Sequence, residues 1–415
     1  MLLNATAAAE KIYGPDAQER LHGTNVCAAA DELFSMLPRY YQNGRSGKEQ
    51  TISMFRNKPD ALIYPALERG LRDNDDSNLR NAAMEIYVAL GGRSLPPLLR
   101  LLRDPDEEVR TFCGVMLGNI KDKEAVPGLI AALSDPDLNV KHAAAEALGK
   151  TGDPRAVDAL IDALGTDMWL QFPAAVALGE LGDRRAVGPL LELLDMPGAN
   201  VPAIQALGKI GDPAAMEPLV RFLEDDEPSL REWALDAVAG LLARVQGGGI
   251  SASVSPKAAG ALIETLKSES YKARRNAAIV LGRFKVREAV PALTPLLADR
   301  DMREDALEAI VRIGGEGALP QLMAYTKESD PLVRRAAVAA LAGLGAERCM
   351  KALLPLLSDP VEEVRAEAAL ALGRSNSEEA RRALAGMLAN MTGAAYEAEM
   401  KALDAYATID RKSVV

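Results

Sequence analysis

Aromatic residues are scarce in this chain: phenylalanine, tryptophan and tyrosine together make up 4% of its 415 residues. Apolar residues nevertheless account for 48% of the chain, which indicates a folded protein rather than a disordered one. A core with so few rings is built mainly from alanine, leucine, valine and isoleucine, as in closely packed helices. The length exceeds what one compact core organises, so the sequence predicts several domains or a repeat array.

Histidine and cysteine are also rare, which limits metal and redox chemistry. The two histidines, His22 and His142, are not followed by glutamate, so the paired ligands of a di-iron site are missing. The three cysteines, Cys27, Cys113 and Cys349, form no CxxC pair, which argues against a zinc knuckle or a redox motif. We expect free, buried thiols in a reducing cytoplasm, and neither a metal nor a cofactor.

Long apolar runs and blocks of positive charge are absent as well. No run of about 18 apolar residues occurs, and the start, MLLNATAAAEKIYG, lacks a basic region, so we expect no membrane span and no signal peptide. The net charge is −11 and no Lys/Arg block stands out, which argues against a nucleic-acid partner. No GxSxG, HExxH or Gly-rich dinucleotide motif is present, so we expect a protein that is not an enzyme.

What the chain has in quantity is a repeat of about thirty residues. The segment DPDLNVKHAAAEALGKTGDPRAVDALIDAL runs from Asp135 to Leu164, and a similar segment begins 31 residues earlier at Asp104. Gly149 recurs thirty residues later as Gly179, and further echoes follow toward the C-terminus. A fixed period of this length is typical of a solenoid.

Each unit reads as two short helices. Val140, Ala144 and Leu148 recur four residues apart and form one apolar stripe on a first helix. The stretch from Gly149 to Gly152 ends that helix, and a second apolar pattern follows it. Two such helices cannot shield their own apolar faces, so each unit must stack on the next.

Asp-Pro pairs are the predicted helix starters. Asp135 is expected to cap the first helix with Pro136 at its first position, and Asp153 with Pro154 to start the second. The same pair recurs at Asp104, Asp212, Asp330 and Asp359.

The repeat resembles the HEAT repeat, in the short form first associated with phycobilisome lyases. The stretch VKHAAAEALGKTGDPRAVDALIDAL and its echoes carry the resemblance, from about Asp73 to Leu388. It implies an all-α, right-handed α-solenoid, a superhelix of about ten HEAT-like helix pairs. The first helix of each pair would lie on the convex side, and the second would line a concave groove.

Three regions follow from this pattern. We expect an N-terminal helical cap over 1–43, a HEAT-like array over 44–390, and a C-terminal capping helix with a tail over 391–415. Within the array, residues 246–257 are rich in glycine and serine and are predicted to be a flexible insertion, either inert or a binding loop.

The resemblance also implies a ladder of aspartate and arginine between repeats. Its acidic members would be Asp122, Asp153, Asp183 and Asp212, after which the acidic position is lost and the later arginines need other partners. Its basic position holds Arg80, Arg110, Lys141, Gln171, Asn200, Arg231, Arg274, Arg303, Arg334 and Arg365.

Two neighbouring units depart from this internal consensus. Pro173 and Pro202 stand at the position that Ala143 holds in an earlier unit, which predicts bent first helices. Trp169 and Phe172 replace an asparagine and a histidine near a helix start that should face solvent. An exposed tryptophan is typical of a binding anchor, although Trp169 would also fit as filler for the gap beside a kink. Trp233 falls at an alanine position and is predicted to be core.

The outward positions of the second helices give another set of candidates. The consensus residue at these positions is small, as at Ala163. In the middle and C-terminal units the residues there become larger and often apolar. A partner's helix or peptide would fit such a groove, and packing against the adjoining helix explains it equally well. These positions are Glu192, Leu193, Arg221, Phe222, Leu296, Tyr325 and Leu356.

Together these features predict a non-catalytic scaffold or adaptor that presents a concave helical groove to a protein or peptide, for example in a prokaryotic signalling or assembly complex. The alternative implied by the resemblance is a tetrapyrrole-handling lyase or chaperone of the phycobilisome-lyase type. That alternative rests on fold, which does not by itself carry function.

Overall fold

The computed structural model describes residues 30–42, 44–73, 75–166, 168–196, 198–244, 252–314, 319–375, 377–389 and 396–413. These ranges are helices joined by short turns and contain no strand, which confirms the prediction of an all-α repeat fold. Residues 1–29 of the predicted N-terminal cap and residues 246–251 of the predicted insertion lie outside the described residues. The contacts divide the chain into two units, 1–206 and 207–415.

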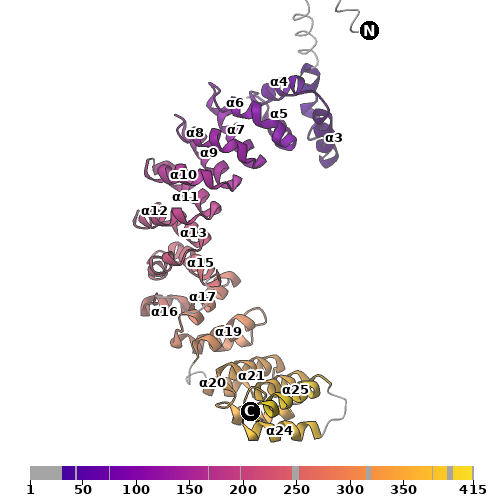
Figure 1. Cartoon of the computed structure of the whole chain (residues 1–415), viewed down its shortest axis with the longest axis vertical. Coiled ribbons are helices and arrows are strands. Elements are labelled where there is room, and N and C mark those ends of the chain that lie inside the picture. The colour runs from indigo at the N-terminus through magenta and orange to yellow at the C-terminus, as the bar shows by residue number, and fades with distance from the viewer. Residues whose placement is uncertain are drawn as a thin grey trace, which may run out of the picture. The chain divides into compact units, whose positions relative to one another are not determined.

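The first unit is a stack of helix pairs. Two helices, α3 (Gly44–Arg56) and α4 (Asp60–Leu71), precede it. Its first helices, α5, α7, α9 and α11, follow one another in the stack, and each contacts the next (Figure 1). They span Ser77–Leu90, Glu107–Ile120, Leu138–Thr151 and Met168–Leu181. The second helices are α6 (Leu95–Leu101), α8 (Val126–Ala132), α10 (Val157–Thr166) and α12 (Val187–Glu192).

The second unit continues the same alternation. Helix α13 (Asn200–Ile210) contains the boundary between the units. The first helices after it are α15 (Pro228–Arg244), α17 (Tyr271–Arg283), α19 (Arg303–Ile313), α21 (Pro331–Gly345) and α23 (Glu362–Leu372). The second helices are α14 (Met216–Val220), α16 (Pro256–Thr265), α18 (Val290–Leu293), α20 (Leu319–Tyr325), α22 (Met350–Leu353) and α24 (Glu378–Ala389). A last helix, α25 (Tyr396–Ser413), packs on α23 and α24.

Small residues allow the first helices to approach closely. The stripe of Val140, Ala144 and Leu148 is at most 1% exposed, as its spacing predicts. Next to it, Gly149 faces Ala177 of the following helix, and a Cβ added to Gly149 would lie 2.8 Å from the Ala177 Cα. Helices that pack backbone against backbone leave little room for rings, which accounts for the shortage of aromatic residues.

The helix starts differ in part from the predicted ones. Helix α9 begins at Leu138, and its cap is Asp137, whose carboxylate accepts two first-turn N–H groups at 2.8 and 3.1 Å. The prediction that Asp135 is this cap is therefore wrong. At Asp153 the prediction is confirmed, although the cap starts a short 3-10 turn ahead of α10. At Asp330 the cap and the following proline lie as predicted.

The two prolines behave differently. Pro173 lies inside α11, which continues past it to Leu181. Pro202 is the third residue of α13, where a helix has no internal acceptor for its N–H group, so the prediction of a bend there is wrong. Trp233 was expected in the core, but it is 40% exposed on α15.

Candidate interaction surfaces

An arginine near the start of a first helix joins consecutive repeats. The Nη1 atom of Arg110 donates to the carbonyl oxygens of Asp104 and Pro105, at 2.8 and 3.1 Å, and so fixes the loop before its own helix. Its Nε and Nη2 atoms donate to the carboxylate of Asp135 in the next repeat, both at 2.9 Å. Both side chains are about nine-tenths buried.

The same arrangement recurs in the second unit. Nη1 of Arg334 donates to the carbonyls of Glu328 and Ser329, and its Nε and Nη2 hold Asp359 at 2.8 Å. The ladder therefore exists, and in these two contacts its acid is the aspartate just before the next first helix. Among the later arginines, Arg334 finds another acidic partner in Asp359.

The predicted acidic partners form a second set of contacts instead. They cap the turns that start the second helices and are Asp122, Asp153, Asp183 and Asp212. Asp153 pairs with Arg155 at 2.8 Å, and Arg155 also donates to the carbonyl of Lys123 in the preceding repeat. Arg185 reaches back to the carbonyl of Pro154 in the same way. Periodicity places these aspartates correctly, but it does not show which edge of the repeat each one faces.

The electrostatics follow these contacts. Burial is the largest single effect on Asp135 and opposes its ionisation, but the hydrogen bonds from Arg110 and from the Asp137 N–H, together with the nearby positive charges, lower the pKa of its carboxyl group. The Arg155 side chain and backbone N–H lower the pKa of Asp153 to about 2. Both shifts arise from partners that hold repeats together, so these carboxylates serve structure.

Large apolar side chains are exposed on one face of α11. Met168 is 71% exposed, Trp169 69% and Phe172 52%. Phe172 lies four residues after Met168 and three after Trp169, so the three share one side of the helix. Leu138, 45% exposed, has the same place in the neighbouring α9. We call these four residues the first-helix patch. Because Trp169 is so exposed, it does not fill a gap beside Pro173.

The predicted groove positions on the second helices divide into two groups. Leu193, Phe222 and Leu356 are 4%, 8% and 7% exposed, so they belong to the core, and the expectation that they line an open groove is corrected. Each lies on a 3-10 segment at the end of its second helix, and those segments span Leu193–Asp195, Arg221–Glu224 and Leu354–Ser358. The tighter turn rotates side chains away from the positions that an α-helical period predicts.

The remaining groove positions are accessible. Glu192 and Arg221 are exposed, and Leu296 and Tyr325 are half-buried. The guanidinium carbon of Arg221 lies 5.1 Å from the centre of the Phe222 ring. The structure thus brings Trp169 and Phe172 together, and Arg221 together with Phe222.

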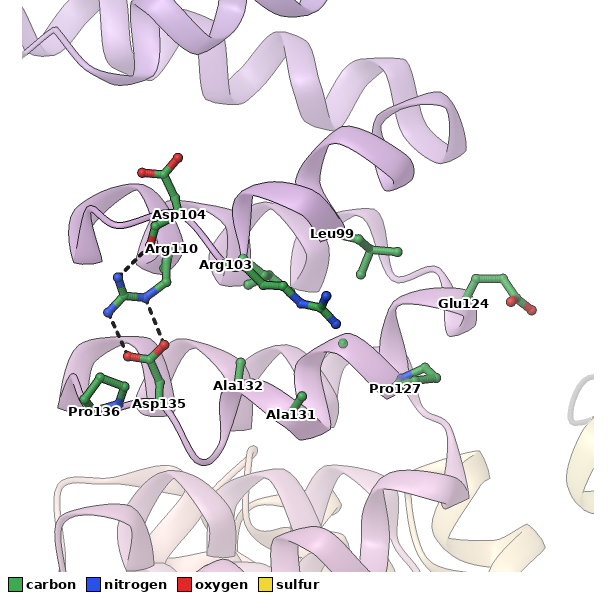
Figure 2. A pocket seen from close by; sticks show the side chains of 12 residues that line it. Leu99, Arg103, Asp104, Arg110, Glu124, Pro127, Ala131, Ala132, Asp135 and Pro136 are labelled. Atoms are coloured by element: carbon green, nitrogen blue, oxygen red, sulfur yellow. Dashed lines mark hydrogen bonds and ion pairs between the residues drawn. The ribbon is translucent and has the colours of Figure 1, made fainter.

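A pocket that the sequence did not reveal lies on the second-helix face of the first unit (Figure 2). It has a volume of about 600 Å³ and lies between α6 and α8, with Leu99, Ala131 and Ala132 among its lining residues. The Arg110–Asp135 pair stands at one end and Glu124 at the other (Figure 2). The signal that could have found it is a run of small residues in α8.

Arg103 is the notable charge in this pocket. Its side chain extends between Leu99 and Ala131 (Figure 2). Within the described part of the chain no hydrogen bond or ion pair joins the Arg103 side chain to another residue. A Cβ added to Gly128 would lie 2.6 Å from Leu99 Cδ2, so the absence of a side chain there lets Leu99 rest against α8.

The described residues contain neither a membrane-spanning helix nor a metal-binding cluster. In those ranges no helix is long and apolar enough to cross a membrane. The same ranges contain no group of three or more histidine, cysteine, aspartate or glutamate residues placed to hold a metal ion.

Comparison with known families identifies the class of repeat. The family model described as HEAT repeats matches residues 95–171, 169–239, 259–342 and 320–400, which is more than half of the chain. The chain therefore belongs to the HEAT-repeat family, and the resemblance seen in its sequence is confirmed. No curated protein matches it.

Several solved structures are similar to this chain. An engineered protein from the Northeast Structural Genomics Consortium has 22% identity and a TM-score of 0.48, covering 76% of this chain and 98% of its own. The CpcE–CpcF complex of phycocyanin lyase from a Nostoc species has 25% identity and a TM-score of 0.35, covering 59% and 92%. A mutant of Kap121p has 13% identity and a TM-score of 0.46, covering 95% and 50%. At these scores the similarities carry no argument about function.

Proposed function

We propose that the chain is a non-catalytic scaffold that binds another protein through the first-helix patch. The observation that carries this proposal is the exposure of Trp169 and Phe172 side by side on α11. In the preceding repeat the same positions are Asn139 and His142, so the structure of a repeat does not require aromatic side chains there.

Burial against a partner would turn this exposed surface into binding energy. Transfer of apolar area from water contributes roughly 25 cal/mol per Å², and tryptophan is among the commonest interface anchors. The methionine beside it adapts its shape to a partner. The exposed polar residues of α9, Asn139, His142 and Glu146, supply the polar rim that surrounds the apolar centre of an interface.

The second-helix face is a weaker candidate for a peptide partner. Arg103 could pair with a carboxylate above the apolar lining of its pocket. In the second unit, Arg221, Leu296 and Tyr325 remain accessible as predicted groove positions. The first-helix patch takes precedence because its side chains are more exposed and of the anchor type.

The absence of catalysis and the cytoplasmic location remain part of the proposal. The lowered pKa values of Asp135 and Asp153 arise from arginines and backbone N–H groups that hold repeats in place, so they do not indicate a catalytic site. The buried free thiols of Cys113 and Cys349 support a reducing compartment.

The experiment is quantitative affinity capture from the native host, followed by a binding measurement with the purified partner. A Trp169→Ala/Phe172→Ala variant is compared with the wild-type chain and with Trp233→Ala, which removes the other exposed tryptophan. If Trp169 and Phe172 are anchors worth about 2 kcal/mol each, the double substitution weakens binding on the order of a thousandfold. Trp233→Ala should bind like the wild type.

All three proteins must show the same melting temperature and helical content. A partner that binds the double variant as tightly as the wild-type chain would contradict the role of the patch. The same partner would then be tested against Arg103→Ala and Tyr325→Ala, which probe the second-helix face.

A further inference from the structure

Arg231 is a ladder arginine that lacks the carboxylate which Arg110 and Arg334 hold. The Nη1 atom of Arg231 donates to the carbonyls of Asp225 and Asp226, at 2.6 and 3.1 Å. These acceptors lie six and five residues before it, as they do for Arg110 and Arg334. The first half of the ladder contact is therefore complete at Arg231, and the guanidinium is held in the same way.

The second half of the contact is missing. Arg110 and Arg334 use Nε and Nη2 to bind Asp135 and Asp359 of the next repeat. The counterpart of those aspartates after Arg231 is Ser268, which precedes Arg274 by six residues just as Asp359 precedes Arg365.

No described residue takes the place of that aspartate. Within the described ranges neither Nε nor Nη2 of Arg231 forms a hydrogen bond or an ion pair. The neighbouring carboxylate of Asp226 pairs with Lys257 instead, at 2.8 Å. The edge of Arg231 that binds a carboxylate elsewhere in the chain is thus available.

A pocket lies where the aspartate is missing. It has a volume of about 360 Å³ and is lined by Arg231, by the hydroxyl residues Ser268 and Ser270, and by the apolar residues Leu235, Ala261 and Leu262. The pocket is formed within the second unit, by α15, α16 and the start of α17.

We propose that this pocket binds a carboxylate carried on a short apolar stem, such as the C-terminal residue of a peptide that ends in leucine. The carboxylate would occupy the position that Asp135 and Asp359 occupy in the other repeats. A guanidinium group matches a carboxylate with two parallel hydrogen bonds, and the apolar stem would rest on Leu235, Ala261 and Leu262. This site does not depend on the proposed scaffold function.

Ser268 and Ser270 are placed to donate hydrogen bonds to a bound carboxylate. Ser268 Oγ accepts the backbone N–H of Ser270 at 3.2 Å, and Ser270 Oγ accepts that of Ala273 at 3.3 Å. Each hydroxyl already accepts a hydrogen bond, so its own proton is available to a carboxylate oxygen. Thr265 differs because its hydroxyl donates to the Ala261 carbonyl at 2.8 Å.

One acidic group opposes an anion in this pocket. Glu232 also lines it, and its exposed carboxylate repels a bound carboxylate through solvent. Arg231 and Glu232 are the charged residues among the described lining of the pocket, so the ligand must bind through the geometry of the guanidinium rather than through net charge.

The test uses the full chain and two small probes in ligand-observed NMR titrations. N-acetyl-leucine carries the carboxylate and the apolar stem, and N-acetyl-leucinamide is its neutral match. We expect N-acetyl-leucine to bind and the amide to bind at least tenfold more weakly. Glu232→Gln should tighten binding of the acid severalfold, and inorganic phosphate should not displace it.

Ser268→Asp is the decisive variant because it restores the missing ladder carboxylate and leaves Arg231 in place. It should abolish binding of N-acetyl-leucine and raise the melting temperature. The matched control is Ser329→Asp, which adds the same charge to the corresponding loop of another repeat and should leave binding unchanged. Arg231→Lys, which keeps the charge and loses the paired donors, should also lose binding.

Three results would overturn the proposal. Binding of the acid that survives Ser268→Asp would place the ligand elsewhere. Equal binding of the acid and the amide would show an apolar pocket with no role for the guanidinium. Binding of phosphate without binding of N-acetyl-leucine would assign the pocket to a different anion.

Discussion

At the scale of residues, two aspartates of one repeat join it to the preceding repeat. Asp135 binds the arginine of the preceding repeat, and Asp153 binds Arg155, which reaches the backbone of the preceding repeat. Each carboxylate also accepts a backbone N–H two residues ahead, at 2.9 Å. One side chain therefore fixes a turn and a contact between repeats together, which explains why aspartate recurs at both positions.

Removal of the ladder carboxylate should be costly. Asp135→Ala leaves the largely buried Arg110 without its partner, and we expect a loss of about 1–3 kcal/mol in the free energy of unfolding, measured by urea denaturation. Asp158→Ala is the matched control, because its pair with Arg185 is exposed and should contribute less than about 1 kcal/mol. Equal losses in the two variants would contradict the importance of burial for this contact.

The contact at Asp153 should respond to acid. Its pKa is lowered to about 2, below the ordinary value of about 3.9, so the folded state favours the ionised form. The stabilisation is fully present above pH 4 or so and is lost as the pH falls toward about 2. The melting temperatures of the wild-type chain and Asp153→Asn should therefore differ at pH 6 and converge near pH 2. If the difference in melting temperature were the same at pH 2 as at pH 6, ionisation of Asp153 would not be its cause.

At the scale of elements, the sequence predicted the helix pairs and part of their contacts. The stripe of Val140, Ala144 and Leu148 follows directly from the α-helical period. Leu193 could not be placed in the same way, because its 3-10 segment changes the direction of the side chain without a clear sequence signal. A comparison with the preceding repeat drew attention to Trp169, but it left open whether the side chain is exposed or fills a gap beside the kink. The missing carboxylate partner of Arg231 also has a sequence signal, because the residues just before α17, Ser268 to Ser270, include no aspartate.

Close packing between first helices makes a specific prediction about glycine. Alanine normally stabilises a helix interior relative to glycine by roughly 0.5–1 kcal/mol, and Gly260→Ala in α16 should do so because no atom lies within 4 Å of the added Cβ. Gly149→Ala should instead destabilise the chain by about 1–3 kcal/mol, because α9 must move away from Ala177. Denaturation curves give the free energy of unfolding of the two variants. If Gly149→Ala stabilised the chain, α9 and α11 would be able to separate slightly at little cost.

At the scale of the whole chain, each repeat contacts its neighbours in sequence, and α7, α9 and α11 illustrate this in the first unit. Stability is then close to a sum of terms for single repeats and for nearest neighbours. The first-helix patch and the pocket at Arg231 are local departures within such an array. A scaffold of this kind can change one repeat for binding while the others keep the consensus contacts.

This view predicts that a whole repeat can be removed and that half a repeat cannot. Deletion of residues 104–134 joins Arg103 to Asp135 and keeps the order of first and second helices. The shortened chain should fold with unchanged helical content per residue, measured by circular dichroism, and with a cooperative thermal transition. Deletion of residues 104–120 removes only α7 and its entry loop, so α8 would follow α6 directly and the apolar face of α9 would lose its partner. That chain should lose its cooperative transition. If both deletions unfolded the protein equally, contacts beyond nearest neighbours would have to carry its stability.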